Sequence, residues 1–286
     1  MARGFLSKER MLKGAMHVHS TYSDGEFTLA ELRRVFLDEG CAFLCMTDHA
    51  EHLAPDRLRQ YIDECQALSD DKFLFVAGLE YSCEQRMHIL GYGAMQRVES
   101  QDPETVIRHI EKQGAVSVIA HPKTDFFEWI EKFDTLPQGI ETWNSKYDGR
   151  YAPRPETFTL LQQLRERKPE MHAFYGQDLH WKKQFRGIFV QLDSDPTSAP
   201  ISAPTSALTN AQGILTALAK GAYTGVKGEL MLPSSGILDK ELLSQFANAH
   251  AASYRMRQLM KQGKQMLDRA GIRVPESVKA QLRRIF

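Results

Sequence analysis

The sequence predicts an α/β fold, a closed or nearly closed barrel of about seven strand–helix units, followed by a helical extension. Three observations predict it. From residue 15 onward, segments typical of strands alternate with segments typical of helices of about ten residues, as in parallel sheets. The 286 residues can form one large hydrophobic core. No Gly-x-Gly-x-x-Gly stands between a strand and a helix, which disfavours a doubly wound sheet.

The first half of the predicted barrel begins with an extended segment that carries two histidines. Thr28-Leu29-Ala30-Glu31 is a capping box, and the helix that it starts is expected to end at Gly40. The apolar segment 43–46 predicts a buried strand that breaks at Thr47-Asp48-His49. A helix is then expected over 55–68, a strand over 72–81 that ends in Gly78-Leu79-Glu80, and a strand over 87–92.

The second half repeats this alternation. We expect helices over 104–112, 125–133 and 155–167, and strands over 115–120, 139–144, 172–175 and 187–192. A connector rich in Pro, Ser and Thr spans 195–209, and a helix (211–220), two short strands (222–232) and two terminal helices (239–270 and 276–285) follow. The sequence therefore predicts a barrel domain, residues 1–235, and a C-terminal helical extension, residues 236–286.

The extension is expected to pack on the barrel through an apolar face that includes Met256, Leu259 and Met260. The chain has 36 basic and 36 acidic residues, so its net charge does not favour long polyanions. From residue 253 to the end, however, nine Lys or Arg stand against two Asp or Glu, a net charge of +7. Contact of this segment with an acidic partner or RNA is therefore the alternative to a helix with a solvated face.

The four cysteines are too few for a disulfide framework in a chain of this length. Cys41 and Cys45 have a spacing seen in zinc sites, but they lead into an apolar strand, which favours buried thiols. No apolar run approaches the length of a membrane span, and the N-terminus has no apolar core of a signal peptide. We therefore expect a cytoplasmic protein that does not enter a membrane.

Potential metal ligands recur at the ends of the predicted strands. One His-x-His segment is a weak signal, but here six of the ten histidines and several carboxylates fall at such positions. They are His17, His19, Asp48, His49, Glu80, His88, His121, Asp178 and His180, and Asp24 lies in a Ser-Asp-Gly turn after the first strand. The carboxyl ends of the strands in a βα-barrel meet on one face, where imidazole and carboxylate groups together can bind transition metals. The other histidines, His52, His109, His172 and His250, are expected to be structural or exposed.

This pattern resembles the PHP superfamily, named for polymerases and histidinol phosphatase. The resemblance covers residues 15–195 and rests on His17-Val18-His19, Ser23-Asp24-Gly25, Thr47-Asp48-His49, Gly78-Leu79-Glu80, His88, Ala120-His121-Pro122 and Asp178-Leu179-His180. Gly176-Gln177-Asp178-Leu179-His180 stands where relatives often have Gly-Ser-Asp-Phe-His, and both ligands are kept. The resemblance implies a distorted (β/α)7 barrel that holds two or three divalent ions, Mn, Fe or Zn, and hydrolyses phosphoesters.

The resemblance also implies three metal sub-sites. His17, His19 and Asp178 would hold one ion, and His88 and His121 a second, with Glu80 bridging the two. Asp24, His49 and His180 would hold a third ion. A bridging carboxylate offsets the repulsion between two nearby dications, so Glu80 is also expected to be essential for catalysis. Asp48 would orient a histidine or, as the alternative, protonate the leaving group.

The expected activity is hydrolysis of a small phosphomonoester or nucleotide by a metal-bridging hydroxide. Lys123, Asn144, Lys146 and Arg186 are candidates for substrate binding, and Lys182 and Lys183 also follow His180 closely. The alternatives are an exonuclease or phosphodiesterase acting on short nucleic acid, an amidohydrolase, and a non-catalytic metal-binding interaction domain. The identity of the substrate, the native metal and the oligomeric state stay open at this point.

Overall fold

The computed structural model describes residues 12–149, 151–192 and 210–269. The chain divides into two units, residues 1–239 and residues 240–286. The strands of the first unit are β1 (Leu12–Val18), β2 (Phe43–Met46), β3 (Asp48–His49), β4 (Leu74–Val76), β5 (Gly78–Ser82), β6 (His88–Tyr92), β7 (Val116–Ala120), β8 (Gly139–Asn144), β9 (His172–Gly176), β10 (Phe189–Leu192), β11 (Tyr223–Lys227) and β12 (Leu230–Pro233).

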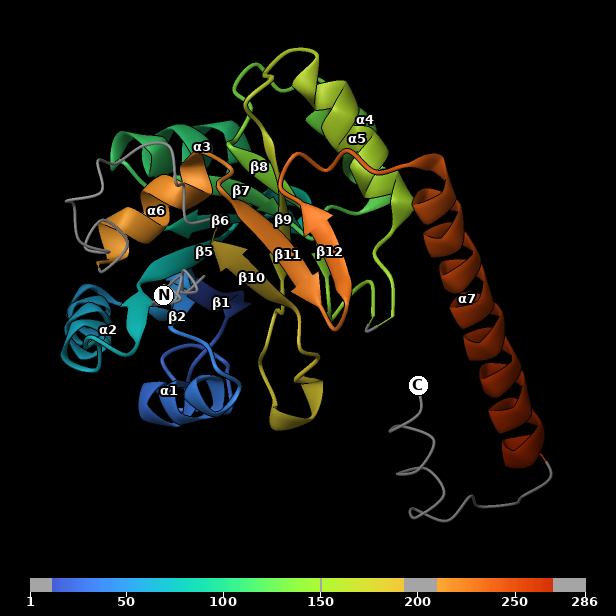
Figure 1. Cartoon of the computed structure of the whole chain (residues 1–286), viewed down its shortest axis with the longest axis horizontal. Helices are drawn as coiled ribbons and strands as arrows, with labels where there is room; N and C mark the ends of the chain where they lie inside the picture. Colours follow the sequence, from blue (N-terminus) through green and yellow to red (C-terminus); the bar gives the residue numbers. More distant parts are fainter. Residues whose placement is uncertain (1–11, 150, 193–209, 270–286) are drawn as a thin grey trace, which may run out of the picture. The chain divides into compact units, whose positions relative to one another are not determined.

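These strands form two six-stranded sheets, shown in Figure 1. The first sheet has the order β12-β11-β10-β1-β2-β4, and the second has the order β3-β5-β6-β7-β8-β9. Pairing is parallel between β1 and β2, β2 and β4, β3 and β5, β7 and β8, and β8 and β9, while β6 and β10 are antiparallel to both of their neighbours. The fold is therefore mixed α/β.

The two sheets are connected at two places, one where the predicted strand over 43–46 breaks and one within the predicted strand over 72–81. The segment 43–49 passes from the first sheet to the second at Thr47, and the segment 74–82 does so at Ala77. At the other edge, the segment after β9 reaches β1. The Gln177 amide donates to the Met16 carbonyl at 2.9 Å, and Val18 and Leu179 form a parallel bridge. The strands thus enclose a common interior, but the pairing gives two sheets, and the predicted closed barrel is not confirmed.

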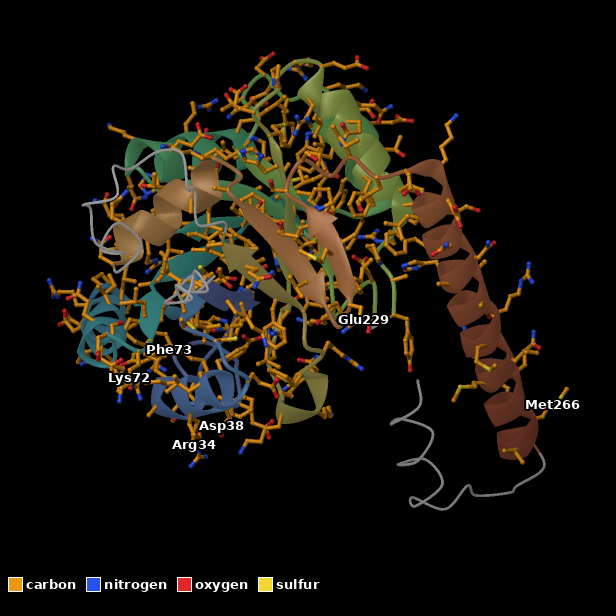
Figure 2. All side chains as sticks on the ribbon, viewed as in Figure 1. Arg34, Asp38, Lys72, Phe73, Glu229 and Met266 are labelled. Atoms are coloured by element: carbon orange, nitrogen blue, oxygen red, sulfur yellow. The ribbon has the colours of Figure 1, made fainter. Side chains whose placement is uncertain are left out.

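Helices cover the outside of the two sheets (Figure 1). They are α1 (Leu29–Asp38), α2 (Pro55–Ala67), α3 (Pro103–Lys112), α4 (Phe127–Ile130), α5 (Pro155–Arg165) and α6 (Ala211–Ala219), and short 3-10 turns lie at 50–52, 84–86, 124–126 and 182–184. Helix α1 has the predicted capping box and buries Leu29, Leu32 and Phe36. Its opposite face carries Arg34 and Asp38, which point outward in Figure 2. This amphipathic pattern fixes which face of α1 contacts β2.

Aromatic side chains fill the interior between the sheets. Tyr223 of β11 donates a hydrogen bond to the Ala173 carbonyl of β9 (2.8 Å), and the ring of Phe174 lies 5.5 Å from that of Tyr223. Tyr175 reaches the Pro233 carbonyl of β12 (2.7 Å). These contacts join β9 of the second sheet to β11 and β12 of the first.

The second unit contains α7 (Lys240–Arg269), a single helix where the sequence predicts one over 239–270. Met256, Leu259 and Met266 are exposed, and Figure 2 shows Met266 projecting from the helix. The predicted connector 195–209 and the predicted helix 276–285 lie outside the described residues, and the packing of the extension on the barrel stays a prediction. None of the helices in the described part of the chain combines the length and apolar character that a membrane span requires.

All four cysteines are buried and unpaired, as predicted. Burial raises the pKa of the Cys41 and Cys83 thiols to about 12. These thiols are therefore protonated packing groups, and neither Cys41 nor Cys45 belongs to a group of possible metal ligands among the described residues.

Candidate metal centre

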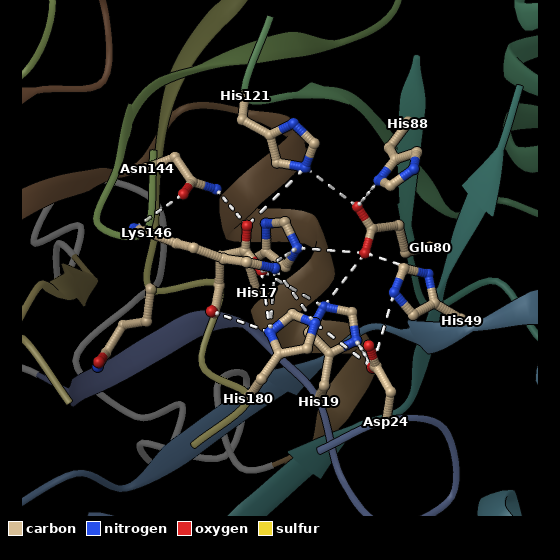
Figure 3. A network of polar contacts seen from close by, with 12 residues as sticks. His17, His19, Asp24, His49, Glu80, His88, His121, Asn144, Lys146 and His180 are labelled. Carbon is tan, nitrogen blue, oxygen red and sulfur yellow. Dashed lines mark hydrogen bonds and ion pairs between the residues drawn. The ribbon is translucent and has the colours of Figure 1, made fainter. Parts of the chain in front are cut away.

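The nine predicted ligands come from distant segments of the chain and lie close together, and Figure 3 labels all of them except Asp178. His17 lies in β1 and His19 directly follows it, His49 ends β3, Glu80 lies in β5, His121 follows β7, and Asp178 and His180 follow β9. His88 is different, since it begins β6 instead of ending a strand. Because β6 is antiparallel to β5 and β7, with His88 opposite Ser82 and Ala120, its first residue still reaches the same face.

Glu80 occupies the middle of this cluster and is 1% exposed. Its Oε1 atom lies 2.7 Å from His88 Nδ1 and 3.3 Å from His121 Nε2. Its Oε2 atom lies 3.1 Å from His19 Nε2 and 3.5 Å from both His17 Nε2 and His49 Nδ1. One carboxylate thus faces two sets of imidazoles, one with each oxygen, as Figure 3 shows. This is the arrangement that a bridging ligand requires.

Three groups of side chains bring their ligand atoms within 4.8 Å of one another: His17, His19 and Asp178; His17, Glu80 and His121; and His19, Asp24, His49 and His180. The first is the predicted first sub-site. The second contains His17 in place of the predicted His88, which instead contacts Glu80. The third is the predicted third sub-site with His19 added. Asp24, 43% exposed, makes this third group the one most open to solvent.

Several nitrogens in the cluster are buried without a hydrogen-bond partner. They are His17 Nε2, both ring nitrogens of His19, and His49 Nδ1. A buried polar atom with no partner costs about 1–3 kcal/mol, so native structures rarely keep several of them together. Nitrogen lone pairs directed into a shared space beside carboxylates fit divalent transition-metal ions. The residues present therefore fit the metals that the resemblance implies.

Backbone strain is concentrated in the same residues. His17 has φ 59°, His121 has φ 29° and Asp178 has φ 50°, all in the left-handed region that non-glycine residues rarely adopt. The β1–β2 register also shifts between Met16 and Val18. His17 lies within this irregularity, so regular strand alternation does not account for the directions of the His17 and His19 side chains. Such strain persists where the surroundings enforce it, most often at functional sites.

Burial and the neighbouring carboxylates act in opposite directions on the histidines. Burial lowers the pKa of His19 to about 3, so its ring is neutral and able to bind a metal. Burial also disfavours charge on His180, but its hydrogen bonds with Asp178 and Asp24 prevail and raise its pKa to about 9. For Glu80, the nearby histidines outweigh burial and hold the carboxyl pKa well below its usual value. The cluster thus stabilises positive charge, which protons or metal cations can supply.

Glu141 belongs to the site and was not among the predicted site residues. Its Oε1 accepts a hydrogen bond from His17 Nδ1 at 2.7 Å, and its Oε2 accepts from the His121 amide and from Asn144 Nδ2, both at 2.9 Å. A proton on His17 Nδ1 leaves Nε2 with its lone pair directed at the cluster. The signal in the sequence was an acid within the otherwise uncharged buried strand Gly139–Asn144.

Asn144 has a different role from the substrate contact that we predicted. Its side-chain NH₂ donates to Glu141 and, at 3.2 Å, to Asp178 Oδ2, while its Oδ1 accepts from the amides of Lys146 and Tyr147. The side chain is fully buried and every polar atom is used. Asn144 therefore positions the acidic groups and the loop, and it is unsuited to contact a substrate.

Lys146 reaches the rim of the cluster. Its Nζ lies 3.2 Å from Asp178 Oδ1 and 3.4 Å from His180 Nε2. Burial opposes its charge, but Asp178 prevails and raises the pKa of Lys146, so the amine is positively charged. A partly exposed ammonium group beside the cluster is placed to pair with an anionic substrate.

Asp48 does not face the cluster. Its carboxylate accepts hydrogen bonds from the backbone amides and the hydroxyls of both Ser20 and Ser23, at 2.6–3.1 Å. Burial raises the pKa of Asp48, and these bonds offset part of that effect. Asp48 thus fixes the loop that carries Asp24, whereas the sequence suggested that it orients a histidine or donates a proton.

The other two residues predicted to bind substrate, Lys123 and Arg186, contact residues outside the cluster. Lys123 is exposed, with its Nζ 5.4 Å from the centre of the Phe126 ring. Arg186 lies in the loop before β10, and Lys227 donates to its carbonyl. Two exposed aromatic side chains that the sequence analysis did not single out lie beside the ligands. The Tyr147 ring is 4.4 Å from that of His121, and the Trp181 ring is 5.8 Å from that of His180.

Comparisons with known proteins bear first on the fold. No known family profile matches the chain. A two-domain protein from Bacteroides vulgatus that contains a predicted PHP-like metal-dependent phosphoesterase aligns over 84% of this chain and 70% of its own, with a TM-score of 0.52 and 19% identity. The chain has the fold of PHP-like phosphoesterases. The predicted resemblance is thereby confirmed at the level of the fold.

Two further proteins are similar to parts of the chain. PsfC from Pseudomonas syringae aligns over 85% of this chain and 98% of its own, with a TM-score of 0.50 and 13% identity. The DNA polymerase/3'-5' exonuclease PolX of Bacillus subtilis is 32% identical over an alignment 77 residues long, and the match covers 24% of this chain and 14% of PolX. The match therefore spans a small part of that relative's length.

Proposed function

We propose that this chain is a metal-dependent phosphoesterase of the PHP superfamily and that its two sheets correspond to the distorted (β/α)7 barrel of that family. The position of Glu80 carries the proposal, with Oε1 toward His88 and His121 and Oε2 toward His17, His19 and His49. The PHP-like fold, the three ligand groups and the unpartnered nitrogens support it.

Two or three divalent ions, when bound, would lower the pKa of a water molecule that they bind to near neutrality, and they would neutralise charge on a phosphoryl group. His17, His19 and Asp178 would hold one ion, Glu80 and His121 with His88 beside them a second, and Asp24, His49 and His180 a third. Mn, Fe and Zn all suit mixed imidazole and carboxylate ligands. No cysteine joins the cluster within the described residues, so thiolates do not bias the choice of metal.

The residues of the chain itself would perform the remaining tasks. Glu141 holds His17 in the tautomer that presents Nε2. Asn144 holds Glu141 and Asp178 in place. The ammonium of Lys146 would pair with a phosphate oxygen. The third group, with its exposed Asp24, would be the side from which the substrate enters.

The substrate that we favour is a small phosphomonoester or nucleotide. The similarity to PolX makes a 3'-5' exonuclease acting on short nucleic acid the second candidate. A long polyanion needs an extended track of positive charge, whereas the 36 basic residues of this chain are balanced by 36 acidic ones. A non-catalytic interaction domain would have no need to keep nine ligands and strained backbone at three of them.

A phosphatase screen on metal-stripped protein supplied with Mn²⁺, Fe²⁺ or Zn²⁺ tests the proposal. Sugar phosphates, nucleotides and short oligonucleotides are compared by phosphate or nucleotide release. Glu80→Ala and His121→Ala should each abolish the activity found. The matched control is His109→Ala, because His109 lies on α3, outside the cluster, and contacts the Gln96 carbonyl. Near wild-type activity in Glu80→Ala would refute the proposed role of the centre.

A further inference from the structure

Trp181 is a large aromatic side chain that remains exposed immediately beside the metal centre. It directly follows His180, and 43% of it is exposed. Aromatic side chains stabilise proteins mainly by being buried, so an exposed indole at the rim of a site gives little to folding. Its ring centre lies 5.8 Å from that of His180, in the ligand group that also contains Asp24 and His49.

The backbone around Trp181 is held in place. The amides of His180 and Trp181 both donate to the Oε1 atom of Gln184, at 3.0 and 3.2 Å. The next amide, that of Lys182, donates to Glu26 Oε2 at 2.9 Å. Three successive residues are thus fixed by side chains from the same turn and from the loop that carries Asp24. The backbone that carries the indole is therefore held by these hydrogen bonds, which limits the conformational entropy that the turn loses when a ligand binds.

Two lysines follow Trp181 in the chain, and one of them contacts its ring. The Nζ atom of Lys183 lies 5.5 Å from the centre of the Trp181 ring, and that of Lys182 lies 5.2 Å from the ring of Phe27. Tyr147, the other exposed ring at the rim, already packs against His121 at 4.4 Å. Trp181 is thus the aromatic surface best placed for a ligand whose phosphate lies at the third ligand group.

We propose that Trp181 is a stacking platform for the base of a nucleotide, and that the substrate of this centre is accordingly a nucleotide. This inference rests on the proposed function, because it assumes that the phosphate binds at the metal centre. A nucleotide joins a planar ring to a phosphate, which are the two groups that the indole and the adjacent centre would bind. Stacking of a base on an aromatic side chain tolerates any base, so we expect little discrimination among bases.

The test compares two ligands that differ only in the base, adenosine 5'-monophosphate and ribose 5-phosphate. Their dissociation constants are measured by calorimetry on the full chain loaded with Mn²⁺. The wild type should bind the nucleotide more tightly. Trp181→Ala should weaken nucleotide binding by roughly 5- to 150-fold, the equivalent of about 1–3 kcal/mol, and leave ribose 5-phosphate within about twofold. Trp181→Phe should keep most of the nucleotide affinity.

The control is Met231→Ala, which removes another exposed apolar side chain, on β12, and should change neither constant. Equal affinity of the wild type for the two ligands, or an equal loss for both in Trp181→Ala, would overturn the inference. Its failure can be distinguished from failure of the proposed function. If nucleotide binding depends on the base and on Trp181 but no phosphoester is hydrolysed, the stacking role of Trp181 is supported and the proposed enzymatic function is refuted. If phosphoesters are hydrolysed equally well with and without Trp181, the enzymatic function is supported and the stacking role is refuted.

Discussion

Replacement of Glu141 by Gln tests how the metal centre is organised. Glu141 is 1% exposed and accepts three hydrogen bonds, one from His17 Nδ1 and two from the His121 amide and Asn144 Nδ2. A glutamine has one acceptor oxygen and one donor NH₂. If its oxygen faces His17, two buried donors lose their acceptor, at about 1–3 kcal/mol each.

The opposite orientation of the glutamine costs less. Its oxygen then accepts from His121 and Asn144, and its NH₂ donates to His17 Nδ1. This forces the proton of His17 onto Nε2, the atom that faces Glu80 and Asp178. We therefore expect Glu141→Gln to fold with a small loss of stability and to bind metal about 10- to 100-fold more weakly, a loss of about 1.4–2.7 kcal/mol.

Calorimetric titration with Mn²⁺ and thermal unfolding of the metal-free protein measure the two effects separately. The control is Glu111→Gln, since Glu111 is also a hydrogen-bonded carboxylate, 2.9 Å from Ser117 Oγ, but belongs to α3. It should leave Mn²⁺ affinity unchanged. An unchanged Mn²⁺ affinity in Glu141→Gln, with the proton of His17 still on Nδ1 by NMR, would refute the reasoning.

Two further substitutions probe the same centre. Gly176→Ala places a methyl group 1.8 Å from Glu141 Oε1, so it should displace that carboxylate and lower both the melting temperature and the Mn²⁺ affinity; an unchanged melting temperature and affinity would contradict this packing. Asp24→Asn removes the exposed anionic ligand of the third group and should lower its occupancy and kcat by about tenfold or more while the other ions stay bound. Elemental analysis together with initial rates checks this, and full occupancy with normal kcat would show that Asp24 is not a ligand.

Much of the fold could be predicted from local signals. The capping box at Thr28, the turn glycines and the short apolar runs place most helices and strands within a few residues of their observed bounds. The sheet arrangement could not be predicted in this way, because it depends on contacts between distant segments. The division of the predicted strand over 72–81 at Ala77 and the antiparallel course of β6 leave no clear periodic trace in a few residues.

The site shows the same distinction. The type of each ligand and its position near a strand end can be read from a few neighbouring residues, so nine ligands could be proposed from the sequence. The structure brings these nine residues together. The supporting groups are not local. Glu141 and Asn144 lie in a strand without a recognisable motif, and Asp48 sits beside a predicted ligand yet turns toward Ser20 and Ser23. Which way such a side chain points depends on the folded backbone.

The number of metal ions bound by the purified protein is a direct test of whether the ligand cluster is a metal centre that hydrolyses phosphoesters. Protein stripped with a chelator, resupplied with Mn²⁺ and freed of excess metal is examined by elemental analysis, and phosphoester hydrolysis is followed in the same samples. We predict at least two ions per chain, since nine ligands exceed what one four-coordinate ion uses, with activity rising as the ions bind. Hydrolysis at full rate by protein that holds no metal, or a saturated chain with a single ion, would contradict it.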